Sequence, residues 1–174
     1  MEPFFHFTHL PELDLQYVEQ SLFVDYNLPK PELTTPTGRV VWSSSSFKDT
    51  KFCKDLEKEF GSISFPIKTN YYRNDPMTMY NWHTDLDRLC SINFLLSDTN
   101  EYLTIAETGK KSRLTTGIDL CKYKFLMPTL LNTEIMHCVI NYSHHPRYIL
   151  AVAPGEGSFD DVKQFLLDYR TDNY

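Results

Sequence analysis

Short runs of aromatic, β-branched and other apolar residues, separated by turn-forming residues, occupy the chain from residue 63 to residue 153. Such runs are typical of β-strands. We expect strands at residues 63–72, 80–85, 90–96, 102–106, 123–127, 130–132, 135–141 and 147–153. Because almost no helical pattern separates these runs, the sequence predicts a mainly β fold in which antiparallel strands form a sandwich or a barrel.

Helical periodicity appears on both sides of this region. Residues 49–60 place Phe52, Leu56 and Phe60 at intervals of four, and Gly61 follows them as a stop signal. A second helix is expected at residues 159–169. Its apolar face consists of Val162, Phe165, Leu166 and Tyr169.

The length of 174 residues is typical of one domain with a substantial core. We expect flanking helices and loops at residues 1–62, the strand-rich core at residues 63–153 and a C-terminal helix within residues 154–174. Within the first part, a short helix could lie between residues 11 and 26. The prolines at positions 29, 31 and 36 break any regular element that follows it.

Composition narrows the class of protein. An apolar content of 41% and an aromatic content of 14% are globular values. No apolar run is long enough for a membrane span, and the first residues lack the pattern of a secretion signal. The four cysteines have no C-x-x-C spacing, so we expect buried, reduced thiols and a cytoplasmic protein. A net charge of −6 argues against a broad nucleic-acid-binding surface.

The candidate chemistry lies on the predicted strands. His83 and Asp85 are two residues apart, and strand side chains at that spacing point to the same face. His137, fifty-two residues after Asp85, could complete a set of two imidazoles and one carboxylate. This is the ligand set of non-haem Fe(II) oxygenases, which leaves metal positions open for substrate and oxygen. Arg147, ten residues further on, offers a planar fork that suits a carboxylate.

Each of these assignments has an alternative. His83 and Asp85 could instead form a surface pair beside the charged residues Asp87 and Arg88. The adjacent pair His144 and His145 competes with His137, but it precedes a proline in a predicted turn, where side chains point outward. By strand parity Arg147 shares a face with apolar residues, and a buried arginine is costly unless it meets an anion. That anion could be a structural Asp or Glu, or a bound carboxylate.

The sequence around these residues resembles the 2-oxoglutarate/Fe(II)-dependent oxygenases, particularly the small prolyl-hydroxylase-like members. The similar segments are residues 80–85, 88–96, 128–133, 137–141 and 147–150, within about half of the chain. A His-x-Asp pair alone is weak evidence for this family. The later histidine and arginine at these spacings make the resemblance specific. The resemblance implies a double-stranded β-helix, or jelly roll, with helices packed on one outer sheet.

The resemblance also implies a set of cofactors. His83, Asp85 and His137 would hold Fe(II), and 2-oxoglutarate would bind as the co-substrate that reacts with O2. Arg147 would hold the far carboxylate of 2-oxoglutarate. The family's products are a hydroxylated substrate, succinate and CO2. Because Asp85 is present, where halogenating relatives lack the carboxylate, the resemblance favours hydroxylation.

A second contact to the far carboxylate is not evident from the motif. Some relatives place a serine two residues after the arginine, where this chain has Ile149. The candidates are Asn93, whose side chain we expect to point inward, and either Tyr71 or Tyr72 on the strand that leads to the motif. Strand parity cannot choose between the tyrosines, because Pro76 makes the intervening segment irregular.

The substrate class is inferred only from the resemblance. By analogy with the family we expect a peptidyl side chain, with prolyl first. A free amino acid or another small metabolite is the alternative, and a nucleobase comes after it. A cupin-like metal-binding jelly roll and a non-catalytic module also stay open. The basic segment at residues 109–113 is interpreted as a solvated hairpin tip, with a substrate-facing lid as its alternative. The oligomeric state is not predicted.

Overall fold

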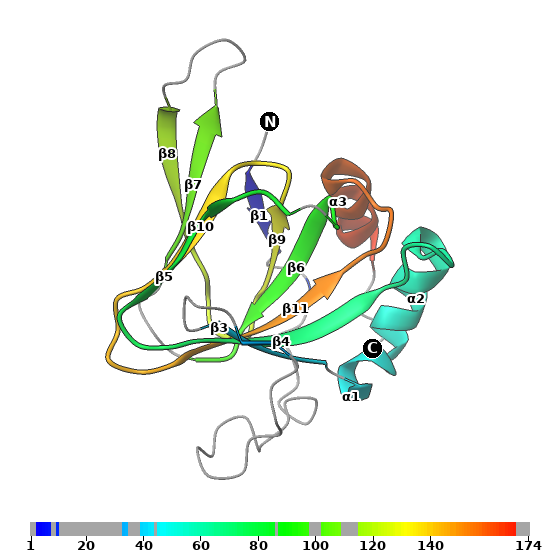
Figure 1. Cartoon of the computed structure of the whole chain (residues 1–174). Helices are drawn as coiled ribbons and strands as arrows, with labels where there is room; N and C mark the ends of the chain where they lie inside the picture. Colours follow the sequence, from blue (N-terminus) through cyan, green and yellow to red (C-terminus); the bar gives the residue numbers. More distant parts are fainter. Residues whose placement is uncertain are drawn as a thin grey trace.

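The chain forms two antiparallel β-sheets (Figure 1) in a computed structural model that describes residues 3–7, 10, 33–34, 39–43, 45–85, 87–97, 102–108 and 115–169. The larger sheet has the strand order β1-β9-β6-β11-β4-β3-β2. Its strands in chain order are β1 (Phe4–His6), β2 (Leu33–Thr34), β3 (Arg39–Ser43), β4 (Lys68–Asn74), β6 (Cys90–Leu95), β9 (Pro128–Asn132) and β11 (Arg147–Ala153).

The smaller sheet has the order β5-β10-β7-β8. Its strands are β5 (Thr78–His83), β7 (Tyr102–Thr108), β8 (Thr115–Lys122) and β10 (His137–Asn141). From β4 onward the chain passes back and forth between the two sheets, apart from the consecutive pair β7 and β8. The fold is therefore a jelly roll, and the predicted fold class is confirmed.

Three helices complete the described part of the chain, and they are α1 (Ser45–Lys48), α2 (Lys51–Phe60) and α3 (Phe159–Asp168). Helices α2 and α3 cover the face of the larger sheet that points away from the smaller sheet (Figure 1). Thr50 caps α2 by accepting a hydrogen bond from the Cys53 N–H at 3.3 Å. The predicted stripe holds, because Phe52 and Leu56 are buried and Phe60 packs against the core.

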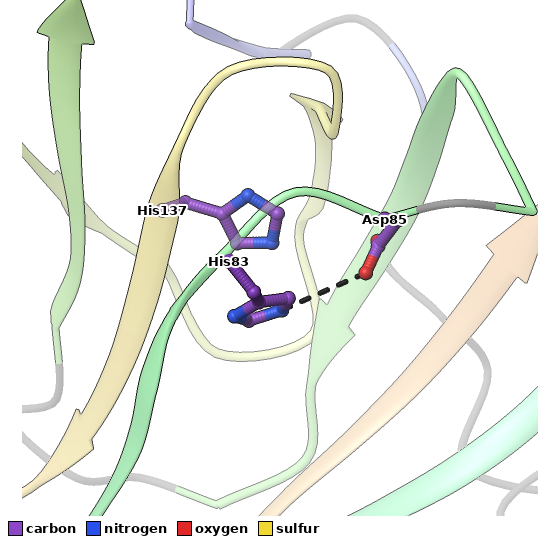
Figure 2. A group of neighbouring side chains, drawn as sticks. All are labelled: His83, Asp85 and His137. Carbon is purple, nitrogen blue, oxygen red and sulfur yellow. Dashed lines mark ion pairs between the residues drawn. The ribbon is translucent and has the colours of Figure 1, made fainter.

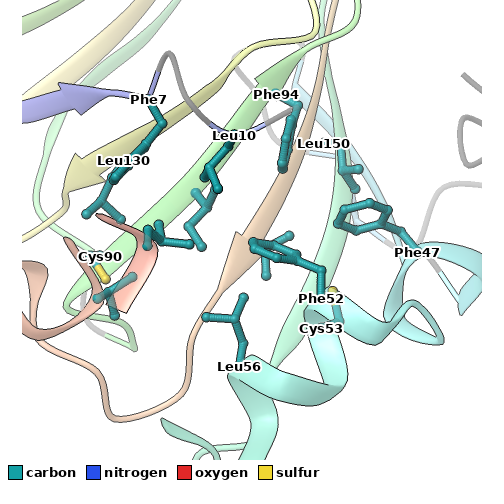
Figure 3. Close-up of a cluster of buried hydrophobic side chains, with 14 of the residues drawn as sticks. Phe7, Leu10, Phe47, Phe52, Cys53, Leu56, Cys90, Phe94, Leu130 and Leu150 are labelled. Atoms are coloured by element: carbon teal, nitrogen blue, oxygen red, sulfur yellow. The ribbon is translucent and has the colours of Figure 1, made fainter. Parts of the chain in front are cut away.

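Two hydrophobic cores lie on opposite faces of the larger sheet. Figure 3 shows the first, in which Phe52 and Leu56 from α2 approach Leu150 of β11. The second lies between the sheets and includes Ile149 and Ala151 of the same strand. Since successive strand residues point to opposite faces, β11 contributes apolar side chains to both cores.

Several predicted strands need correction. The strand expected from residue 63 begins at Lys68, after Pro66, which has no N–H for a sheet ladder. Strand β5 begins at Thr78 and ends at His83, so Asp85 lies beyond it. The strand expected at residues 123–127 is wrong, because Leu126 has a φ of 59° and only an isolated bridge forms there. Strand β8, which precedes this segment, was missed.

The region expected to hold flanking helices and loops also contributes strands. Strand β1 pairs with β9 at one edge of the larger sheet, and β3 pairs with β4 toward the other. These runs of three to five residues are too short to show a clear period, and their pairing with distant strands decides their conformation. The helix expected within residues 11–26 and the basic segment at 109–113 lie outside the described residues.

Two further expectations can be compared with the structure. Cys53, Cys90, Cys121 and Cys138 are all buried and form no disulfide. Burial raises the pKa of the Cys53 thiol to about 11, so this thiol stays protonated at neutral pH. No helix in the described part of the chain has the length and apolar character needed to cross a bilayer.

Candidate metal centre

His83, Asp85 and His137 come together at one end of the smaller sheet (Figure 2). One possible ligand atom from each residue lies within 4.8 Å of the others. His83 ends β5 and His137 begins β10, and the two are directly paired across the strands. Their ring centroids are 4.3 Å apart. The described residues therefore contain a cluster that could hold one metal ion.

A β-bulge determines which side chains of β5 reach this cluster. His137 pairs with His83 and Val139 pairs with Tyr80, so two steps along β10 match three along β5. The extra residue reverses the alternation, which brings both Tyr80 and His83 to the inner face. Their rings meet edge to face, with centroids 4.4 Å apart. Without the bulge, side chains three positions apart would point to opposite faces.

Hydrogen bonds to the backbone identify the free nitrogen of each imidazole. Nδ1 of His83 lies 2.6 Å from the carbonyl oxygen of Asn81, and Nδ1 of His137 lies 2.8 Å from that of Ile135. A carbonyl oxygen only accepts, so each Nδ1 carries the proton and each Nε2 keeps its lone pair. Burial lowers the pKa of His137, and the neighbouring His83 adds to this effect. These two rings suit a metal that binds neutral imidazoles through Nε2.

Asp85 supplies the third ligand candidate from a loop. Its N–H donates to the carbonyl oxygen of Thr133 at 3.0 Å, which ties the loop to the turn after β9. Its Oδ2 accepts a hydrogen bond from Nε of Arg88 at 2.7 Å. Its Oδ1 lies 3.6 Å from Nε2 of His83. One alternative placed His83 and Asp85 at the surface beside two charged residues. One of these, Arg88, is instead partly buried and contacts Asp85 directly.

A pocket extends from the histidines into the space between the two sheets. Its walls combine polar and apolar side chains, and the described residues that line it include no carboxylate. They are Tyr72, Asn74, Tyr80, His83, Arg88, Asn93, Tyr123, Leu131, His137, Val139, Arg147, Ile149 and Ala151. The pocket is therefore suited to a small anion.

Arg147 lies deep in this pocket, and only 1% of its surface is exposed. Its guanidinium lies over the ring of Tyr123, whose hydroxyl accepts a hydrogen bond from Nδ2 of Asn93 at 3.2 Å. Ser91 donates to Oδ1 of Asn93 at 2.8 Å and so fixes the orientation of this amide. Burial raises the pKa of Tyr123, and the nearby Cys121 adds to this effect, so the hydroxyl remains a hydrogen-bond donor at neutral pH.

The structure distinguishes between the three residues that were candidates for a second contact to the far carboxylate. Asn93 and Tyr72 both line the pocket, as the sequence allowed. Tyr71 is wrong for this role, because it points to the opposite face of β4 and packs in the core beneath the helices. The sequence analysis missed Tyr123. It directly follows β8, a strand that was not predicted, so its position near Arg147 could not be inferred from the sequence.

The competing histidines lie away from the cluster. His144 and His145 are exposed in the turn between β10 and β11, as predicted. Asn141 organises this turn, because its Nδ2 lies within hydrogen-bond distance of the carbonyl oxygens of His145, Asn74 and Asp75, at 2.9, 3.1 and 3.1 Å. The same amide therefore holds the turn after β4 against the turn between β10 and β11.

No family model matches the chain, and no curated protein is similar enough in sequence to count as a relative. Several solved structures share its fold. A prolyl-4-hydroxylase from Pseudomonas putida is 12% identical with a TM-score of 0.51, covering 71% of this chain and 74% of that chain. A 2OG-Fe(II) oxygenase family oxidoreductase from Burkholderia pseudomallei is 13% identical with a TM-score of 0.51, covering 80% and 79%.

A third similar structure is a prolyl hydroxylase from Trichoplax adhaerens, in complex with a peptide fragment of the hypoxia inducible factor oxygen degradation domain. It is 14% identical with a TM-score of 0.50, covering 79% of this chain and 70% of that chain. At these identities the comparisons show a common fold. The chain is thus a jelly-roll protein that shares its fold with these 2-oxoglutarate oxygenase and prolyl hydroxylase structures, and it has a candidate metal cluster at one end of its smaller sheet.

Proposed function

We propose that the protein is a 2-oxoglutarate- and Fe(II)-dependent dioxygenase that hydroxylates a C–H bond of a peptidyl side chain, with prolyl as the first candidate. The observation that carries this proposal is the convergence of His83, Asp85 and His137 beside a pocket with a buried Arg147 at its base. Two imidazoles and one carboxylate form the facial ligand set of non-haem Fe(II) oxygenases.

The donor set fits iron. His83 and His137 would bind the metal through Nε2, because their Nδ1 atoms are held by backbone carbonyls. Asp85 would bind through Oδ1 and would offset part of the metal's charge. When bound, Fe(II) with 2-oxoglutarate and O2 would supply the oxidising chemistry, with release of succinate and CO2. The protein's part is to hold the ligands on one face and leave the other positions accessible.

The pocket fits the dicarboxylate co-substrate. Arg147 would bind the far carboxylate with a charge-assisted pair, and the Tyr123 hydroxyl would add a second donor. Tyr123 would thus supply the contact that some relatives make with a serine at the position of Ile149. Ile149 and Ala151 provide an apolar wall that excludes water from the co-substrate's methylene groups. The absence of a carboxylate among the described lining residues avoids repulsion of an anion.

The exposed flank of β5 supports a polypeptide as the prime substrate. This strand is the edge of the smaller sheet, and it carries Met79 and Trp82 with 40% and 39% of their surface exposed. Both precede His83 in the same strand. An extended chain beside this edge could therefore contact apolar side chains while one residue enters the pocket. The peptide bound to the Trichoplax prolyl hydroxylase supports the same substrate class. A free amino acid or another small metabolite is the alternative.

The test combines metal and co-substrate binding under anaerobic conditions. Purified protein should bind one Fe(II), and added 2-oxoglutarate should produce a weak visible charge-transfer band. Once O2 is admitted, succinate formation should rise when a responsive peptide from a proline-containing library is supplied. Metal binding without any response to 2-oxoglutarate would favour a cupin-like protein, and failure to bind metal would favour a non-catalytic module.

A cytoplasmic location is part of the proposal, and the four buried, unbridged cysteines support it.

A further inference from the structure

Asp85 differs from the two histidines in how it is positioned. Strand β5 ends at His83, so the sheet does not set the direction of the Asp85 side chain. The backbone N–H of Asp85 is held by the carbonyl of Thr133, but this contact leaves the carboxylate free to rotate. Another side chain must therefore select its orientation.

Arg88 makes the contact that selects it. Its Nε donates to Oδ2 of Asp85 at 2.7 Å, and the two side chains are only 14% and 11% exposed. This occupies Oδ2 and leaves Oδ1 facing Nε2 of His83 at 3.6 Å. A charge-assisted hydrogen bond in a poorly solvated position holds its geometry far better than an exposed pair does.

Arg88 is itself held at both ends. Its carbonyl oxygen accepts a hydrogen bond from the Thr133 hydroxyl at 2.8 Å, which fixes the backbone. Its guanidinium carbon lies 5.9 Å from the centroid of the Tyr72 ring, and its Nη1 lies 3.4 Å from the Tyr72 hydroxyl. Tyr72 lines the pocket in which we place 2-oxoglutarate. One guanidinium thus contacts both the candidate metal ligand and the wall of the co-substrate pocket.

We propose that Arg88 is a positioning residue that makes Asp85 a one-oxygen metal ligand and couples the metal site to the co-substrate pocket through Tyr72. The proposal rests on the metal centre of the proposed function. A carboxylate that binds through both oxygens would occupy one more position on the metal. By holding Oδ2, Arg88 keeps that position open for the co-substrate or oxygen.

The experiment uses Mn(II) as a redox-silent metal and requires no turnover. Arg88→Gln should weaken Mn(II) binding about ten- to a hundredfold, the range typical of lost partners of metal ligands. Electron spin resonance of bound Mn(II) should also show one exchangeable water fewer, because the freed carboxylate can bind through both oxygens. A purely structural ion pair would change the unfolding midpoint and leave the water count unchanged. Wild-type affinity together with an unchanged water count would overturn the proposal.

Arg73→Gln is the matched control. Arg73 forms an ion pair with Asp75 through Nε at 3.0 Å, next to Tyr72 in β4, but it does not line the pocket. This variant should keep wild-type Mn(II) affinity. If Arg88→Gln does not fold, Arg88→Met keeps the length of the side chain without a donor for Oδ2 of Asp85. It should show the same loss of affinity, and wild-type binding by a folded Arg88→Met would overturn the proposal.

The coupling through Tyr72 is tested with a double-mutant cycle on 2-oxoglutarate affinity. Tyr72→Phe and Arg88→Lys should together cost clearly less than the sum of their separate effects, because they interrupt one contact. Strict additivity would overturn the coupling. His137→Ala separates this inference from the proposed function. If that variant still binds Mn(II) normally, the proposed metal centre fails. If it loses Mn(II) and Arg88→Gln does not, only the role of Arg88 fails.

Discussion

The guanidinium of Arg147 lies over the ring of Tyr123, with Cζ 5.1 Å from the ring centroid. Arg147 begins β11 in the larger sheet, and Tyr123 directly follows β8 of the smaller sheet. The contact therefore spans the interior between the sheets. It places a cation and a protonated hydroxyl at the same end of the pocket, where a carboxylate of the co-substrate would lie.

Removal of the Tyr123 hydroxyl should weaken co-substrate binding. Tyr123→Phe keeps the ring against Arg147 and loses a hydrogen bond to a charged group, so we expect about tenfold lower affinity for 2-oxoglutarate. Isothermal titration calorimetry of the Mn(II)-loaded protein with 2-oxoglutarate measures this affinity. Tyr71→Phe is the matched control, because Tyr71 lies in the core on the other face of the sheet. An equal loss in both variants would show that Tyr123 acts only through packing.

Arg147 should contribute to co-substrate binding and not to metal binding. Arg147→Gln removes the charge-assisted pair with the far carboxylate, worth about 1.5–3 kcal/mol, and should lower 2-oxoglutarate affinity about ten- to a hundredfold. Mn(II) affinity should remain close to that of the wild type. Because Arg147 is only 1% exposed, the folded fraction must be checked by circular dichroism. Unchanged 2-oxoglutarate affinity in folded protein would return Arg147 to a structural role.

His137 should be essential for the metal. His137→Ala leaves two ligand candidates, which cannot hold a labile Fe(II) firmly, so both Fe(II) binding and the visible band with 2-oxoglutarate should disappear. His144→Ala serves as the control, since His144 is exposed in a turn away from the cluster. The assignment fails if the control variant loses the metal and His137→Ala retains it.

The metal-free protein should lose stability in mildly acidic solution. Burial lowers the pKa of His6, and the charge of Lys124 adds to this; burial and His83 lower the pKa of His137. Both histidines take up protons more readily in the unfolded chain, so protonation favours unfolding. Stability should be full above the ordinary histidine pKa of 6.5 and decline below it, until the lowered pKa values are passed.

Urea unfolding between pH 8 and pH 5.5 measures this decline in the free energy of unfolding. His6→Gln should make the decline shallower while leaving the stability near pH 8 little changed, because the side chain can still contact Thr129. A decline of the same steepness in this variant would show that His6 does not contribute.

Local sequence patterns determined much of this protein. Alternation placed Arg147 on the same face as Ile149 and Ala151, and it correctly turned Asn93 inward. These inferences succeed because the direction of a side chain on a regular strand depends only on its neighbours in the chain. The spacing of the histidines and Asp85 also selected the cluster that the structure brings together, although Asp85 lies beyond the end of β5.

Only the tertiary structure decided the rest of the site. The bulge that turns Tyr80 and His83 to one face exists because β5 pairs with β10, more than fifty residues away. Tyr123 reaches Arg147 across two sheets, and Arg88 approaches Asp85 through a loop that no period describes. Strand pairing and loop closure depend on contacts between distant segments. A local pattern therefore identified the candidate ligands, while the side chains that orient them emerged only when the sheets came together.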